Sequence, residues 1–187
     1  MKSFNLKVLL LLSLGHIVTD IYQSALPTIL PFLKEKLDLT YTMTGVILMA
    51  ASFTSSLIQP LFGFLTDKQE KPILLPFGCL CAGIGFSFIT LAPNYTLVLA
   101  LVVISGLGIA SYHPEGYKTA HFFTGERRVT GMAIFSVGGN VGFALVPRNI
   151  SSFVYITNMI SWHKLKDGGC HVAKISSNFD TGGTYSP

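Results

Sequence analysis

The first hydrophobic segment constrains the fold more than any other part of the chain. Between Val8 and Phe32 it is about 25 residues long and carries one charged side chain, Asp20. At about 1.5 Å per residue this length covers the ~30 Å hydrocarbon core of a bilayer, which predicts a membrane-spanning helix. Asp20 then falls near mid-membrane, where an ionisable group costs at least ~2.5 kcal/mol. Other helices or a water-filled cavity must therefore surround its carboxyl.

The composition supports a membrane protein. Half of the 187 residues are hydrophobic and only 12% are charged, whereas soluble domains carry roughly 25% charged residues. The apolar residues form long runs, which predicts an all-α, polytopic bundle with membrane lipid around it. No stripe of Lys and Arg indicates a nucleic-acid partner.

We expect five spans in a bundle that covers residues 1–147. They lie at about 8–33, 41–65, 73–92, 95–115 and 129–147. The first span continues past Asp20 without a small-residue cleavage site, which disfavours a signal peptide. Basic residues in short loops mark the cytoplasmic side and place the N-terminus inside. The predicted inside residues are Lys2, Lys7, Lys68, Lys71, Lys118, Arg127 and Arg128, against Lys34 and Lys36 outside.

The residues after Pro147 have a different character. The apolar stretch 150–162 is short for a span and rich in Ser, Thr and Asn, so we expect an interfacial helix there. The polar, Gly- and Ser-rich remainder to residue 187 is predicted to be disordered. With five spans and a cytoplasmic N-terminus, the tail would lie outside together with several basic residues. Basic residues are expected inside, so we expect that the tail is not part of the bundle.

A polar face on the first span is the main candidate for chemistry. His16, Asp20, Gln23 and Pro27 follow one another at helical spacing and so share one side of the helix. We hypothesise that Asp20 carries a proton and that His16 is its partner, because a polar stripe inside a membrane marks a protein or water interface. The alternative is an Asp20 that only hydrogen-bonds neighbouring helices.

A second polar group lies near the inner end of the fourth span, in the segment HPEGYK. His113 and Glu115 could form a substrate or gating cluster together with Tyr112. The alternative is an interfacial charge pair between Glu115 and Lys118, which are three residues apart.

Neutral polar groups and glycines occupy the second and fifth spans. Gln59 is predicted to bond between helices, since Pro60 follows it, and Asn140 either does the same or lines a cavity. Gly138 and Gly142 form a GxxxG pair that lets helices approach closely.

Enzymatic signatures are lacking in the sequence. It has no phosphate-binding glycine loop, nucleophile elbow or zinc signature, and its three cysteines form no framework. We therefore expect no enzyme, no cofactor and no metal.

Several strings together resemble the fosmidomycin-resistance branch of the major facilitator superfamily over about residues 5–147. They are GHIVTDIYQSALPTILPF (15–32), SSLIQPLFGFLTDK (55–68), GLGIASYHPEG (106–116) and GGNVGFALVP (138–147). The resemblance implies a bacterial inner-membrane exporter of drug-like molecules that exchanges them for protons, with two six-helix halves. This chain matches only the first five helices, so it is expected to be a truncated N-terminal part. The substrate cavity is then expected to involve Tyr22, Gln23, Tyr112, His113, Glu115 and Asn140.

The loop after the second span resembles the superfamily signature between its second and third helices. Glu70 and Pro72 depart from the pattern, which leaves the match incomplete. The resemblance implies a gating latch, and the alternative is a solvated loop that only fixes topology. The fitting residues are Gly63, Leu65, Asp67, Lys68 and Lys71.

Three functions remain open from the sequence. The first is a proton-coupled efflux transporter, present as its N-terminal part. The second is an inert remnant, because a central cavity needs walls from both halves. The third is a membrane interaction protein that partners a separate second half or itself.

Overall fold

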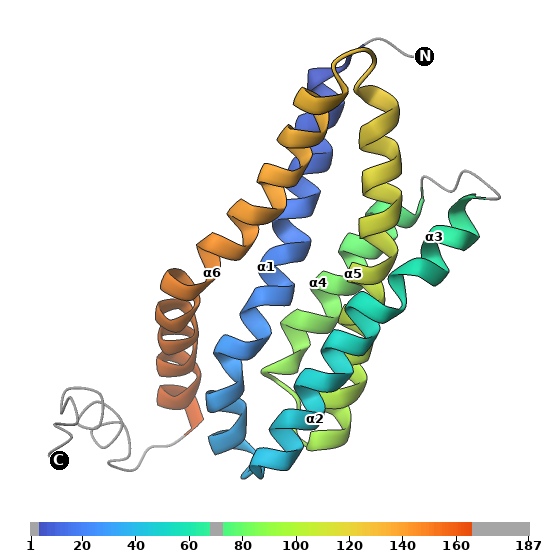
Figure 1. Ribbon diagram of the computed structural model, residues 1–187. Coiled ribbons are helices and arrows are strands. Elements are labelled where there is room, and N and C mark those ends of the chain that lie inside the picture. The colour runs from blue at the N-terminus through green and yellow to red at the C-terminus, as the bar shows by residue number, and fades with distance from the viewer. Residues whose placement is uncertain (1–3, 68–72, 166–187) are drawn as a thin grey trace, which may run out of the picture. The chain divides into compact units, whose positions relative to one another are not determined.

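The computed structural model describes residues 4–67 and 73–165, with side chains placed over 4–66 and 73–146. Every regular element in this part of the chain is helical, which confirms the all-α prediction (Figure 1). In chain order the elements are α1 (Leu6–Lys36), α2 (Tyr41–Ser52), the π-helical turn η1 (Phe53–Leu57), α3 (Gln59–Asp67), α4 (Leu74–Ile89), α5 (Tyr95–Phe123) and α6 (Arg128–Leu165).

Four helical stretches are long and apolar enough to cross a membrane. They are Leu6–Lys36, Tyr41–Thr66, Tyr95–Phe123 and Arg128–Val146. The second of these runs through α2, η1 and α3 without a break in direction large enough to end it. Helix α4 has 16 residues, or about 24 Å at helical rise, and is shorter than the span expected over 73–92.

Polar residues set the first turns of three helices. The side chains of Asn5, Thr40 and Asn94 accept hydrogen bonds from the backbone N–H groups of Val8, Met43 and Leu97, at 3.2, 3.2 and 2.9 Å. Each cap satisfies a backbone donor that the helix itself leaves unpaired. These caps fix where α1, α2 and α5 begin.

Helices α4 and α5 pack closely because glycines remove side chains from their contact. A Cβ atom on Gly85 would lie 2.6 Å from the backbone nitrogen of Ser105, and one on Gly78 would lie 2.8 Å from the carbonyl oxygen of Gly108. The hydroxyl of Ser105 donates to the carbonyl of Ala82 at 3.1 Å. Close backbone approach and hydrogen bonds between helices replace the hydrophobic effect inside a bilayer.

Helix α1 lies between α5 and α6 and supplies the centre of the core. Leu9 and Leu12 pack with Tyr112 and Ala120 of α5 and Phe135 of α6. Gly138 and Gly142 of α6 meet the α1 backbone, as the GxxxG pattern predicts: a Cβ at Gly142 would lie 2.5 Å from the carbonyl oxygen of Ile17.

Two helices run further than the sequence predicts. Helix α5 continues through Pro114 to Phe123 instead of ending near residue 115, because neighbouring helices let a membrane helix tolerate proline. Helix α6 continues past Pro147 to Leu165 and includes the stretch 150–162. The first compact unit ends at Ser151 and a second begins at Ser152. Residues 166–187, predicted to be disordered, lie outside the described residues.

Candidate functional site

A buried cluster of two histidines and one aspartate lies where α1 and α5 meet. His16 and Asp20 come from α1 and His113 from α5, and at most 8% of any of these residues is exposed. The Nε2 atom of His16 lies 3.4 Å from Oδ2 of Asp20, and the Nε2 atom of His113 lies 3.3 Å from Oδ1. Each carboxylate oxygen therefore faces one imidazole nitrogen.

The backbone of α6 fixes the orientation of His16. Its Nδ1 atom lies 3.0 Å from the carbonyl oxygen of Phe135. A carbonyl only accepts, so Nδ1 carries the proton and a neutral His16 has a bare lone pair on Nε2. That lone pair faces Asp20, so the pair is repulsive until a proton sits on either Nε2 or the carboxyl. A proton on either atom would turn this contact into a hydrogen bond.

Aromatic rings and a tyrosine hydroxyl enclose the cluster. The His16 ring stacks on Phe135 with centroids 4.3 Å apart and meets His113 edge-on at 5.0 Å. The Tyr112 hydroxyl donates to the carbonyl of Leu12 at 2.7 Å. On the α6 side Gly139 leaves the space, because a Cβ there would lie 2.5 Å from Oδ2 of Asp20.

The same three residues form a set that could hold a metal ion. One nitrogen from each histidine and one carboxylate oxygen all lie within 4.8 Å of one another. Imidazole and carboxylate are common ligands of Zn²⁺. The sequence predicts no metal, because the third ligand, His113, comes from a different helix from His16 and Asp20 and the three follow no known ligand spacing.

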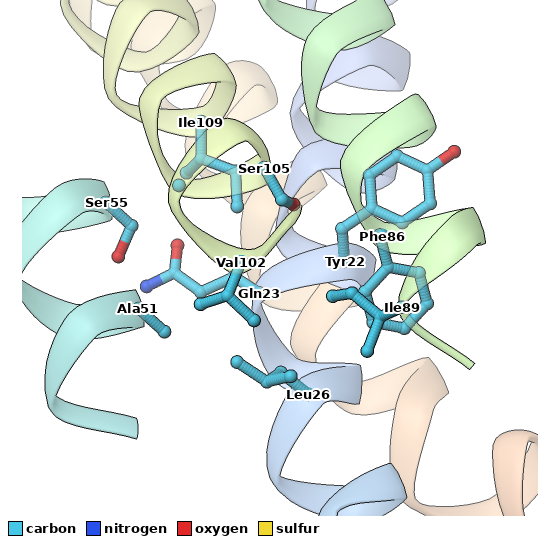
Figure 2. Close-up of a pocket in the computed structure, with 11 residues that line it drawn as sticks. Tyr22, Gln23, Leu26, Ala51, Ser55, Phe86, Ile89, Val102, Ser105 and Ile109 are labelled. Carbon is cyan, nitrogen blue, oxygen red and sulfur yellow. The ribbon is translucent and has the colours of Figure 1, made fainter. Parts of the chain in front are cut away.

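A small cavity lies next to the cluster between α1, α2, η1, α4 and α5 (Figure 2). Its volume is about 30 Å³, which suits one water molecule and is far below the ~300–1,000 Å³ of a drug-sized ligand pocket. Tyr22 and Gln23, both predicted to line a substrate cavity, are among its lining residues.

The sequence profile of the Major Facilitator Superfamily matches residues 12–163. The chain belongs to this superfamily. The match extends past Pro147, whereas the motifs noted in the sequence end there.

The superfamily relatives include proteins with different named substrates. The chain is 34% identical over 140 residues to YfnC, an uncharacterized MFS-type transporter of Bacillus subtilis. It is 35% identical over 136 residues to the fosmidomycin resistance protein of Escherichia coli and 26% identical over 168 residues to the phosphoglycerate transporter protein of Salmonella typhimurium.

These alignments cover 75%, 73% and 85% of the chain, but only 34%, 34% and 35% of the three relatives. The chain thus spans about a third of the length of the relatives that it matches. No solved structure matches the chain.

The other predicted substrate residues of this superfamily member differ in burial. Tyr112 is buried against α1. Glu115 is 4% exposed, so it lies inside the bundle and not at its rim. Asn140 has an exposed side chain on α6, and Pro27 is exposed although His16 and Asp20 are buried.

Gln59 differs from its prediction. Its Nε2 atom donates to the carbonyl of Ser55 at 2.6 Å. This bond lies within the second span, whereas the sequence predicted a bond between helices. Ser55 lies four residues before Gln59, about one helical turn, so its carbonyl is within reach of the side chain.

The superfamily signature loop lies partly outside the described residues. Lys68 and Lys71 fall in the gap, and Asp67 ends α3 without a placed side chain. A Cβ on Gly63 would lie 3.8 Å from Pro114 of α5, and Lys118 of α5 donates to the carbonyl of Thr66 at 2.6 Å. The end of α3 is therefore held against α5.

Sequence reasoning missed three functional contacts. It did not pair His113 with Asp20, because no local pattern reports contacts between helices. It missed the carbonyl of Phe135 for the same reason. It also missed Ser55, which η1 buries beside the cavity; the run of Ser and Thr at 52–56 was the available signal.

Proposed function

We propose that this chain forms part of a proton-coupled exporter of a small, drug-like molecule. Two observations support the proposal: membership of a transporter superfamily and similarity to a fosmidomycin resistance protein. The observation that carries the proton role is the pairing of His16 Nε2 with Asp20 Oδ2 at 3.4 Å, with Nδ1 held by a backbone carbonyl.

The proposed mechanism uses one exchangeable proton in the cluster. With the proton, Asp20 and His16 attract each other, and α1 stays packed on α6 through the Phe135 carbonyl. Without it, the carboxylate and the imidazole lone pair repel, which loosens this contact. The loosened and the packed arrangements of α1 and α6 are then in equilibrium. A bound proton shifts this equilibrium only if it binds one arrangement more tightly than the other. Proton binding would therefore bias the bundle between two arrangements.

The proposed setting follows from the sequence. The N-terminus is cytoplasmic and the chain lies in a bacterial inner membrane, as the loop charges and the relatives' organisms favour. The substrate meets the bundle beside Tyr22 and Gln23, close to the proton site. The same proposal includes a latch role for Gly63, Asp67, Lys68 and Lys71. It also includes cavity roles for Tyr112, Glu115 and Asn140.

A transport assay tests the proposal. The chain is expressed in a fosmidomycin-sensitive bacterium, and export is followed in inverted membrane vesicles with and without a proton gradient. We expect gradient-driven export that Asp20→Asn abolishes. The matched control is Asp38→Asn, since Asp38 is exposed in the loop after α1. Export that Asp20→Asn leaves unchanged would exclude the proton role.

One observation favours a second function, a membrane protein that works only with a partner. The cavity beside the cluster holds about 30 Å³. A larger hollow of about 320 Å³ beside Tyr22 and α4 is open on one side, so these helices leave it without a complete wall. A second copy or a separate half-transporter would then supply the other wall. In this case the chain alone confers no resistance but still binds a proton at Asp20, and resistance returns when the C-terminal part of a relative is co-expressed.

A further inference from the structure

The small cavity contains two polar side chains among apolar ones. Gln23 reaches in from α1 and Ser55 from η1, while Leu26, Val102 and Ile109 form apolar walls. Figure 2 shows the Gln23 amide and the Ser55 hydroxyl pointing toward one another across this space. The contacts of the described residues include no direct hydrogen bond between these two side chains.

The turn η1 leaves the Ser55 hydroxyl facing the cavity. Ser55 is 3% exposed and lines the cavity. Its backbone carbonyl is already taken by Gln59 at 2.6 Å. A π-turn widens the helix and is frequent at functional sites. A hydroxyl both donates and accepts, so a small ligand with both donor and acceptor capacity is favoured here.

Two other residues at the cavity carry hydroxyls, Tyr22 and Ser105, and Figure 2 shows the Tyr22 hydroxyl pointing away from Gln23 and Ser55. Ser105 donates to the carbonyl of Ala82 at 3.1 Å, which directs it toward α4. Gln23 therefore provides an amide donor and an acceptor, and Ser55 provides a hydroxyl that can do either. A buried water makes 2–4 hydrogen bonds and requires a space of at least ~10–15 Å³. Gln23 and Ser55 together provide enough donors and acceptors for such a water.

We propose that this cavity binds one ordered water molecule that bridges Gln23 and Ser55 and connects the Asp20 cluster to the water outside it. The position of the cavity supports the proposed connection to the Asp20 cluster. Gln23 lies three residues after Asp20, or about 4.5 Å along α1, and Ile109 lies one turn before His113 on α5. The water therefore sits beside the proton site, on the seam between the same two helices.

The relay role rests on the proposed proton function, but the water site does not. In the relay the bridging water accepts a proton from outside and releases another toward the cluster, with no change in its own charge at the end. Gln23 and Ser55 are positioning residues, because they hold the water and do not carry the proton.

Solid-state NMR on the full chain in lipid nanodiscs tests the water site. We expect magnetisation transfer from water to the Gln23 side-chain amide protons. Ser55→Val should remove it, Ser55→Thr should keep it, and Ala51→Leu should remove it by filling the space. Ser56→Val is the matched control, because Ser56 is an exposed neighbour in the same turn. Absence of the signal in the wild type, or its persistence in both Ser55→Val and Ala51→Leu, overturns the proposal.

Time-resolved infrared spectroscopy tests the relay. After a pH jump, the carboxyl band of Asp20, identified by its loss in Asp20→Asn, should rise several-fold more slowly in Ser55→Val and at the wild-type rate in Ser56→Val. If Ser55→Val loses the NMR water signal but Asp20 is still protonated at the wild-type rate, the water is not a proton relay. If the carboxyl band of Asp20 shows no protonation at all, the proposed proton function is wrong. The NMR water signal still decides whether the cavity binds a water molecule.

Discussion

The Nε2 atom of His113 on α5 lies 3.3 Å from Oδ1 of Asp20 on α1, inside the bundle. This contact joins two helices at a buried carboxylate oxygen that forms no hydrogen bond. Asp20 also faces His16, so the carboxyl of α1 links a residue of its own helix to one of α5. Several measurable consequences follow from this arrangement and its surroundings.

His113→Ala should destabilise the protein. The substitution removes the imidazole nitrogen that lies 3.3 Å from the buried Oδ1 of Asp20, and loss of a buried polar contact of this kind costs about 1–3 kcal/mol. The measurement is the free energy of unfolding in detergent micelles. His121→Ala is the control, because His121 has an exposed side chain near the end of the same helix. Surface changes of this kind stay within about 0.5 kcal/mol. Equal effects of the two substitutions would show that the His113–Asp20 pair contributes nothing.

Asp20→Asn should leave the protein folded while it removes the exchangeable proton. The asparagine NH₂ group can donate to the bare Nε2 of His16, and its carbonyl oxygen can accept from His113. We therefore expect a thermal midpoint close to that of the wild type and loss of a pH-dependent carboxyl infrared band. An unfolded variant would mean that the charge of Asp20, and not its hydrogen bonds, holds the cluster together.

Gly142→Ala should separate α1 from α6. Its added methyl would lie 2.5 Å from the carbonyl oxygen of Ile17 and 3.0 Å from Cβ of Asp20, and overpacking of this kind costs about 1–3 kcal/mol. Gly45→Ala is the matched change: nothing lies within 4 Å of the added atom, so helix propensity should stabilise α2 by up to ~1 kcal/mol. The free energies of unfolding should move in opposite directions.

Tyr112→Phe should cost about 0.5–1.5 kcal/mol, because it removes the 2.7 Å hydrogen bond to the carbonyl of Leu12. The Leu12 carbonyl keeps its helical partner, so the loss should be at the low end. Tyr41→Phe serves as the comparison, since Tyr41 is 83% exposed. A thermal-shift series in detergent measures both. If the two variants have the same midpoint, the Tyr112 hydroxyl does not stabilise the α1–α5 contact.

The sequence predicted the parts of this fold that depend on local chemistry. Long apolar runs gave the helices, and the spacing of His16 and Asp20 on α1 gave a polar face. The close contact of Gly138 and Gly142 with α1 also followed from their spacing. Each of these features depends on residues within a few turns of one another, so a single segment carries the signal.

The remaining features depend on contacts between segments. The partnership of His113 with Asp20 joins α1 to α5, and the carbonyl of Phe135 reaches His16 from α6. The sequence predicts that the fourth span ends near residue 115, but packing lets α5 continue through Pro114 to Phe123. Gln59 donates to a carbonyl in its own span instead of bonding to another helix. No periodicity in one segment reports such relations.

The turn η1 also changes how the second span must be read. An α-helix rotates about 100° with each residue, and a π-turn takes up one residue more than an α-turn does. The residues before Phe53 and those after Leu57 are therefore rotated about the helix axis by about 100° relative to a continuous α-helix. A helical wheel drawn straight through Tyr41–Thr66 assigns one half of it to the wrong side. Deleting one residue in this turn would bring the two halves back into phase, and α3 would present a different flank to its surroundings.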